Sequence, residues 1–187
     1  MEKIQADFGK TLYWVQIKDM ERGYELRVDD KIFAQLVFQS AWGTLATGSS
    51  VEDGWTFKRV GFLNPRVTIR PPGEETNEAE YWPKFWGGGK LIFPDGRHFL
   101  WDSANFWGTQ WTFSDAVENR LFVFLPGGEV HKASEDYHSQ AVVEIDPRAY
   151  DHPELPLLLV LGWYLMVLQQ EDSSAGSAAI VAGGSAA

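Results

Sequence analysis

The sequence predicts one mainly β domain that closes around a buried apolar helix near the C-terminus. Short runs of β-forming residues follow one another from about residue 11 to residue 145, and turn signals separate them. A stretch without any charge, residues 155–168, comes after these runs. The length of 187 residues fits a single domain better than two domains.

The expected strands either alternate apolar with polar residues or are rich in β-branched and aromatic residues. They cover residues 11–17, 24–28, 31–38, 55–60, 66–70, 90–93, 97–101, 111–114, 121–125 and 139–145. Pro94-Asp95-Gly96 predicts a tight hairpin, because proline presets φ and glycine accepts a positive φ. The spacing of roughly ten to twelve strands is typical of a sandwich or barrel. No amphipathic helices alternate with them, which argues against a parallel α/β sheet.

Residues 155–168 would form a helix that is apolar on every face, so it must be buried in a protein core or in lipid. A membrane span needs about 20 apolar residues, and this run is shorter. Gln169-Gln170-Glu171-Asp172 follows it without a basic anchor. A core helix near 154–170 is therefore the preferred interpretation, with a tail anchor as the alternative. An antiparallel sheet that curls fully round the helix can supply the core.

The domain is expected to span residues 1–172, because the composition changes after that point. Residues 173–187 consist mostly of alanine, glycine and serine, and they predict a flexible tail. The start of the chain, Met1 to Asp7, lacks a basic segment followed by an apolar run, so it is not expected to be a secretory signal. The sequence predicts a cytoplasmic protein, peripheral to membranes if lipid binding is its function.

The composition narrows the classes of function. Hydrophobic residues make up 44% and aromatic residues 14% of the chain, which is enough for a large core. The absence of cysteine excludes disulfides, thiolate metal sites and a cysteine nucleophile. Sixteen basic against 26 acidic residues give a net charge of −10, which opposes binding to nucleic acid and weakens general attraction to anionic membranes.

Three features together resemble the tubby C-terminal domain superfamily, which includes the LURP-one-related proteins and the phospholipid scramblases. They are the apolar helix of residues 155–168, the aromatic and basic segment 55–62, and the hairpin of residues 93–101. The resemblance is one of layout and covers about residues 10 to 170. It implies a closed barrel of roughly twelve strands with the helix through its centre, and a non-enzymatic role.

The resemblance also implies a class of ligand. Tubby-like members bind phosphoinositides through lysine and arginine on the barrel wall, and scramblase-like members associate with membranes. This chain departs from both, because it has no cysteine to palmitoylate, no proline-rich N-terminal arm and a strongly acidic net charge. These departures argue against the lipid function more than against the fold.

The candidate ligand-binding residues are Lys58, Arg59, Arg66 and Arg70, which lie in a segment free of acidic residues. Arg66 and Arg70 have the same strand parity, so they project from one face. A phosphate head group favours such cations, and arginine can contact it with two hydrogen bonds. The alternative is a solvated strand face whose charge is balanced by the nearby Glu52 and Asp53.

Two further clusters are weak metal candidates, and no cofactor is expected. His131, Glu135 and His138 could share one face of a helix, but Gly127-Gly128 before them indicates a loop. The acidic run of residues 74–80 lacks the EF-hand pattern and is interpreted as a solvated loop.

Six aromatic residues between positions 82 and 111 could stack on a sugar or a hydrophobic ligand, but a place in the core is the preferred interpretation. They are Trp82, Phe85, Trp86, Phe106, Trp107 and Trp111. His98, Asp102 and Ser103 lie in one short segment, which cannot arrange a catalytic triad.

The sequence therefore favours a non-enzymatic binding module for membrane phospholipid head groups or for a protein partner. A small-molecule carrier or an enzyme with a β-barrel pocket is the alternative class. The helix separates these possibilities, because a helix that fills the barrel leaves no lumen for a ligand.

Overall fold

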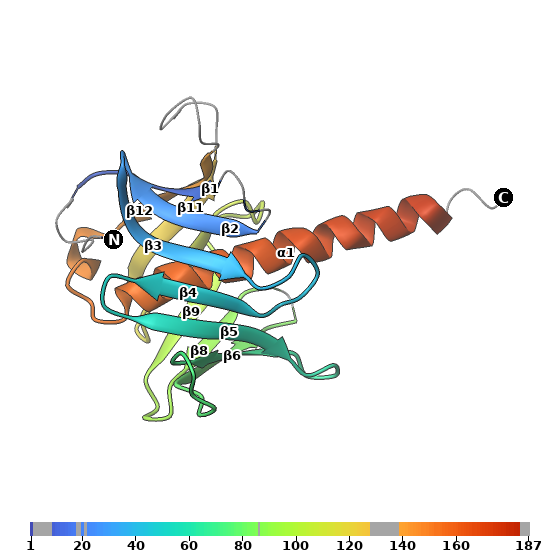
Figure 1. The fold of residues 1–187 in the computed structure, drawn as a ribbon, viewed down its shortest axis with the longest axis horizontal. Coiled ribbons are helices and arrows are strands. Elements are labelled where there is room, and N and C mark those ends of the chain that lie inside the picture. Colours follow the sequence, from blue (N-terminus) through green and yellow to red (C-terminus); the bar gives the residue numbers. More distant parts are fainter. Residues whose placement is uncertain (2–8, 18–19, 21, 86, 128–138, 184–187) are drawn as a thin grey trace.

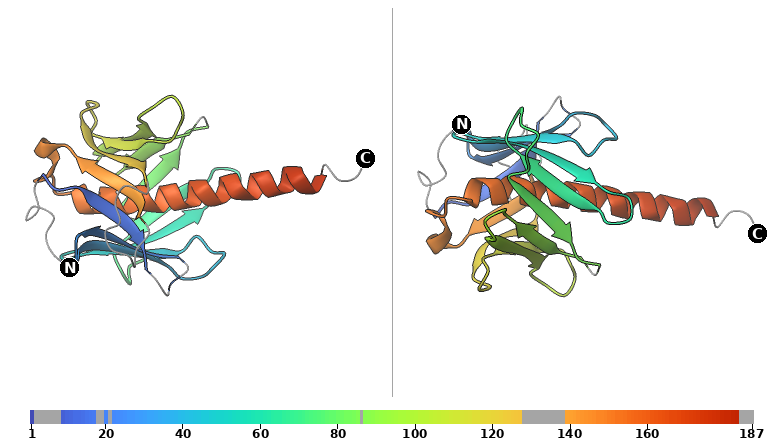
Figure 2. Two further views of the ribbon diagram at one scale, coloured as in Figure 1. Left: turned by 90° about the horizontal axis from the view of Figure 1, so that it is seen from above. Right: turned by 90° about the horizontal axis from the view of Figure 1, so that it is seen from below.

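In the computed structural model, the strands form a closed antiparallel barrel and one long helix passes through it (Figures 1 and 2). The structure describes residues 1, 9–17, 20, 22–85, 87–127 and 139–183, with side chains described up to residue 174. The elements are β1 Leu12–Gln16, β2 Gly23–Val28, β3 Lys31–Phe38, β4 Ala46–Ser50, β5 Gly54–Val60, β6 Arg66–Arg70, β7 Ala79–Pro83, β8 Gly89–Ile92, β9 His98–Ser103, β10 Trp111–Ser114, β11 Arg120–Pro126, β12 Ser139–Ile145, the 3-10 turn η2 Pro147–Ala149, and α1 Leu155–Gly183.

Each strand pairs with its neighbours in the chain, and β1 pairs with β12 to close the barrel. Successive strands run in opposite directions, so the connections between them alternate between the two ends of the barrel. We call the end with the β2–β3, β4–β5, β6–β7, β8–β9, β10–β11 and β12–α1 connections the entry end, because α1 starts there. The opposite end is the exit end. The predicted fold class is confirmed.

The first half of α1 occupies the interior of the barrel. Residues 155–168 are buried except for the partly exposed Pro156 and Met166, so the interpretation as a core helix is confirmed. Trp163 stacks on Trp14 of β1 with ring centroids 5.7 Å apart, and Tyr164 stacks on Phe38 of β3 at 5.5 Å. A helix surrounded by sheet can be apolar on every face because no face meets water.

Two glycines allow close packing between the helix and the barrel wall. A Cβ at Gly48 of β4 would lie 2.6 Å from side-chain atoms of both Val160 and Phe57. A Cβ at Gly162 of α1 would lie 2.7 Å from the Phe124 ring. Helix and sheet can therefore pack at these distances only where no side chain separates them.

Polar contacts fix the helix at both ends of the barrel. At the entry end, Arg97 of the β8–β9 turn forms an ion pair with Glu154. At the exit end, the Tyr164 hydroxyl donates to the Thr44 carbonyl at 2.7 Å. Arg22 forms an ion pair with Glu171 there, at 2.9 Å.

The helix is longer than expected. Residues 173–183, predicted as part of a flexible tail, continue α1 to Gly183 and project beyond the barrel (Figure 1). Alanine has the highest helix propensity, and a helix that has already formed extends at low cost. Residues 184–187 lie outside the described residues. No helix in the described part of the chain is long and apolar enough to cross a membrane.

Candidate functional site

The structure divides the predicted basic cluster between the two faces of the barrel wall. In the β5–β6 register, Lys58 lies opposite Thr68 and Arg59 lies opposite Val67. Lys58, Arg66 and Arg70 share the outer face, while Arg59 has the inward parity and lies beside α1 at the exit end. Arg66 and Arg70 do share a face, as predicted. Four residues of strand, about 13 Å, separate them, so they do not converge on one point.

The outer-wall arginines already have polar partners. Nε of Arg66 lies 3.5 Å from Oε1 of Glu80, and its guanidinium lies 5.2 Å from the centre of the Trp82 ring. Nε of Arg70 donates to Asn77 at 2.7 Å, and the Asn77 amide donates to Glu80 at 2.7 Å. Glu80 and Asn77, rather than the expected Glu52 and Asp53, therefore lie against these two arginines.

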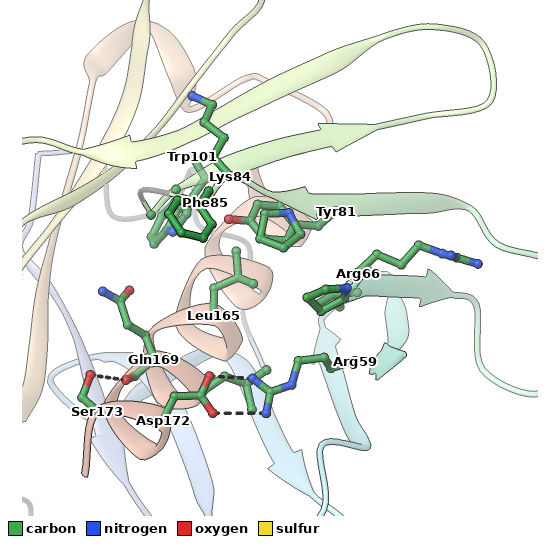
Figure 3. Close-up of a pocket in the computed structure, with 16 residues that line it drawn as sticks. Arg59, Arg66, Tyr81, Lys84, Phe85, Trp101, Leu165, Gln169, Asp172 and Ser173 are labelled. Atoms are coloured by element: carbon green, nitrogen blue, oxygen red, sulfur yellow. Dashed lines mark hydrogen bonds and ion pairs between the residues drawn. The ribbon is translucent and has the colours of Figure 1, made fainter. Parts of the chain in front are cut away.

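Arg59 forms a two-pronged ion pair with Asp172 of α1 (Figure 3). Its Nη1 and Nη2 donate to the two carboxylate oxygens at 2.6 and 3.2 Å. The hydrogen bonds to Asp172 raise the pKa of the Arg59 guanidinium. This fork geometry is the one with which arginine binds carboxylates and phosphates.

A cavity of about 510 Å³ opens beside this ion pair, between α1 and the strands β5 to β9 (Figure 3). Buried apolar side chains form its inner wall, among them Leu165, Leu168, Val67 and Trp101. Polar groups lie at its edges: Arg59 and Asp172 on one side, Lys84 on another. Lys84 Nζ contacts Asp102 at 2.8 Å.

Tyr81 of β7 also lines the cavity, and its hydroxyl points toward the Phe85 side (Figure 3). Among the described residues, this hydroxyl has no hydrogen-bond partner. Burial, together with the charge of Asp102, raises the pKa of Tyr81 above its usual range. The hydroxyl therefore remains protonated and can donate a hydrogen bond to a group in the cavity.

A second cavity of about 530 Å³ lies where α1 passes β10, β11 and β12. Trp111, Leu125 and Met166 contribute to its lining, together with uncharged polar residues of α1 such as Gln170. Unlike the first cavity, it has no charged residue in its lining among the residues that the structure describes. Both cavities lie at the exit end, because α1 fills the barrel interior that a lipocalin-like carrier would leave open.

Large hydrophobic side chains stand exposed on four successive loops of the exit end. At least 80% of each side chain is accessible for Trp42, Phe62, Leu63, Phe85, Phe106 and Trp107. The preferred interpretation of the aromatic residues as core is therefore wrong for Phe85, Phe106 and Trp107. It is correct for Trp111, which is buried, while Trp82 is partly exposed and Trp86 lies outside the described residues.

Local hydrogen bonds hold these loops with their aromatic residues outward. Nη1 of Arg22 donates to the carbonyls of Ser40 and Gly43 at 2.7 and 2.6 Å, on either side of Trp42. The Asn105 side chain accepts from the Thr109 N–H at 3.0 Å and so closes the loop that carries Phe106 and Trp107. The aromatic side chains are thus exposed on structured turns.

Charge is distributed unequally between the two ends of the barrel. The four loops of residues 39–45, 61–65, 84–88 and 104–110 contain no acidic residue. The two other exit-end connections contain acidic residues in the sequence and lie partly outside the described residues. Every connection at the entry end contains at least one acidic residue, although Arg97 balances Asp95 in the β8–β9 turn. The acidic residues of this end are Asp29, Asp30, Glu52, Asp53, Glu74, Glu75, Glu78, Asp95, Asp115, Glu118, Asp146, Asp151 and Glu154.

The other candidates form no site in the described residues. Residues 131–138, with the two histidines, lie outside them, and no group of three potential metal ligands occurs among the residues that the structure describes. The acidic run 74–80 lies in the β6–β7 connection and the start of β7. Its last member, Glu80, bonds to Asn77. Asp102 bonds to Lys84 rather than to a catalytic partner.

Trp42, Leu63 and the cavity are parts of the site that the sequence analysis did not single out, while Phe85, Phe106 and Trp107 were candidates for which a place in the core was preferred. The sequence does contain a signal for the exposure of Trp42, Phe62 and Trp107, because turn-forming residues flank them. These residues are Gly43, Gly61, Asn64, Pro65, Asn105 and Gly108. The contribution of Asp172 to the cavity could not be read from the sequence, since it lies 113 residues from Arg59. Comparison with family models, curated proteins and solved structures found no match.

Proposed function

We propose that the protein is a non-enzymatic membrane-binding module and that the exit end of its barrel lies against the bilayer. The observation that carries this proposal is the separation of aromatic, acid-free loops at the exit end from the acidic entry end. Tryptophan and phenylalanine favour the membrane–water interface. Most acidic residues of the connections lie at the far end, so a protein of net charge −10 can present its less acidic end to an anionic surface.

The charges on α1 fit this orientation. Glu171 and Asp172 pair with Arg22 and Arg59 where the helix leaves the barrel. Residues 173–187 carry no charge. The projecting end of α1 can therefore enter the membrane interface without burying an unpaired charge.

The proposal extends to lipid head groups. Arg66 lies at the exit end of β6, next to the loop that carries Phe62 and Leu63, so it is closer to the proposed membrane surface than Arg70 at the other end of the strand. The closed barrel around a central helix supports the resemblance to the tubby C-terminal domain superfamily, whose members bind phosphoinositides. In this proposal the protein is cytoplasmic and peripheral to the membrane.

Flotation of the purified protein with lipid vesicles, without detergent, tests the proposal. The wild-type protein should float with neutral and anionic vesicles. Replacing Trp42, Phe62 and Trp107 by serine should weaken binding at least tenfold, because three exposed apolar anchors are lost.

Val117→Ser is the matched control, because Val117 is an exposed apolar residue of the entry end. It should float like the wild-type protein. Wild-type protein that floats with no vesicle composition would overturn the proposal and favour a barrel that binds a protein partner.

A further inference from the structure

The cavity beside Arg59 combines an apolar wall with a cation at its edge. Leu165, Leu168 and Trp101 are among the residues that line it, so an apolar ligand would meet apolar side chains on its inner wall. Its volume of about 510 Å³ falls in the range of small-molecule sites in proteins. A ligand that matches both parts must have an apolar chain and a charged group.

The charge of that group follows from the residues at the edge. Arg59 already holds a carboxylate, that of Asp172, with two hydrogen bonds. Both side chains are partly exposed, at 36% and 59%, so a ligand can reach the ion pair from solvent. The Asp172 carboxylate occupies the position in which a ligand carboxylate or phosphate would be bound.

The cavity beside Arg59 differs from the second cavity in its charged lining. The second cavity has a similar volume and also lies beside the emerging helix, but none of its described lining residues is charged. Both cavities can accept apolar groups. The first cavity is lined by three cations, Arg59, Arg66 and Lys84, against the one carboxylate of Asp172, and this excess of positive charge favours an anionic ligand.

We propose that the cavity between α1 and β5–β9 binds a single-chain anionic amphiphile, such as a fatty acid or a lysophospholipid. Its anionic group binds to Arg59 in competition with Asp172. Its chain lies along Leu165 and Leu168, and the Tyr81 hydroxyl donates to a polar atom of the ligand. This site goes beyond the proposed membrane docking, because a monomeric amphiphile can occupy it without any bilayer.

Isothermal titration calorimetry with dodecanoate, below its micelle concentration and without vesicles, tests the site. Arg59→Met keeps an unbranched apolar stem but removes the guanidinium and its charge, and it should weaken binding roughly tenfold. Lys58→Met is the matched control, because Lys58 is the preceding residue and faces outward. It should bind like the wild-type protein.

Asp172→Asn provides a gain of binding, which misfolding cannot produce. It removes the internal carboxylate that competes for Arg59, so dodecanoate should bind several-fold more tightly. Dodecyl phosphate in a parallel titration identifies the preferred head group: tighter binding than dodecanoate assigns a lysophospholipid, and weaker binding assigns a fatty acid.

Three results would overturn the inference: unchanged affinity in Arg59→Met, unchanged or weaker affinity in Asp172→Asn, or uncharged dodecanol that binds as tightly as dodecanoate. These outcomes are independent of membrane docking, because the titration contains no vesicles. A protein that floats with vesicles but fails this titration would retain the proposed function and lose the amphiphile site.

Discussion

Trp163 of α1 stacks on Trp14 of β1, with ring centroids 5.7 Å apart and an angle of 10° between the ring planes. The contact joins the first strand to the last helix, and both side chains are at most 1% exposed. The barrel therefore buries its core only when β1, β12 and α1 are all in place.

A charge in the centre of the helix should prevent folding. Leu159→Asp and Leu161→Asp each place an unpaired carboxylate where the native side chain is at most 1% exposed. Both variants should be insoluble or lack a cooperative thermal transition. Gln170→Asp, on the exposed part of the same helix, is the control and should keep the wild-type transition within about 0.5 kcal/mol. A soluble, folded Leu159→Asp protein would show that the helix is not enclosed.

Gly162→Ala should destabilise the protein although alanine favours helices by about 1 kcal/mol over glycine. The added methyl group would meet the rings of Phe124 and Trp101, at 2.7 and 3.2 Å from the ideal Cβ position. Overpacking typically costs about 1–3 kcal/mol, which exceeds the gain in helix propensity. Chemical denaturation measures the difference. Ser174→Ala, at an exposed position of α1, should be neutral or stabilising, and a stabilised Gly162→Ala protein would contradict the close approach.

The Glu78 carboxyl should make the protein less stable as the pH rises. Burial, together with the negative charges of Glu154, Asp53 and Glu74, raises the pKa of the Glu78 carboxyl. A raised pKa means that the folded state favours the protonated form, so this contribution to stability is present at low pH and is lost as pH rises through the folded-state pKa.

Glu78→Gln should therefore raise the melting temperature slightly at pH 7. The difference from wild type should vanish below about pH 4, where the carboxyl is protonated in both states. Thermal melts across pH 3–8 measure this, with the exposed Glu75→Gln as the control, because Glu75 is not among the charges that raise the pKa of Glu78. A Glu78→Gln protein that is less stable than wild type at pH 7 would show that the charged carboxylate is favoured in the fold.

The two outer-wall arginines should contribute unequally to binding of phosphoinositide vesicles. Arg66 begins β6 at the exit end, and Arg70 ends it at the entry end. The two arginines lie on the same face of one strand, but Arg66 is closer to the proposed membrane surface. Arg66→Glu should weaken flotation with phosphoinositide vesicles several-fold, and more strongly at low salt. Arg70→Glu should have a smaller effect. Equal effects would place the head group on the side of the barrel rather than at its exit end.

Much of the fold could be predicted because the strongest sequence signals are local. Alternating strands, the Pro94-Asp95-Gly96 turn and the uncharged run 155–168 each reflect short-range geometry. Two strands, β4 and β7, were not predicted. In β4 the small residue Gly48 is needed because Val160 and Phe57 come so close, and small residues leave no hydrophobic pattern to detect.

Little of the site could be predicted, because it depends on which loops share one end of the barrel. Phe85, Phe106 and Trp107 were expected in the core on the basis of their apolar character. Their exposure follows from their place between turn residues in exit-end loops. The split of Arg59 from Lys58 follows from strand parity, but the partner of Arg59 comes from α1 and required the tertiary structure.

The chain contains no cysteine, so one introduced cysteine can carry a polarity-sensitive fluorophore at a single chosen position. Phe62→Cys and Phe106→Cys place the dye on two exit-end loops, and Val117→Cys places it at the entry end. On addition of vesicles, the two exit-end labels should shift to the blue and gain intensity, while the label at position 117 should not change. Equal responses at both ends, or a response at position 117 alone, would contradict the orientation in which the exit end binds the membrane.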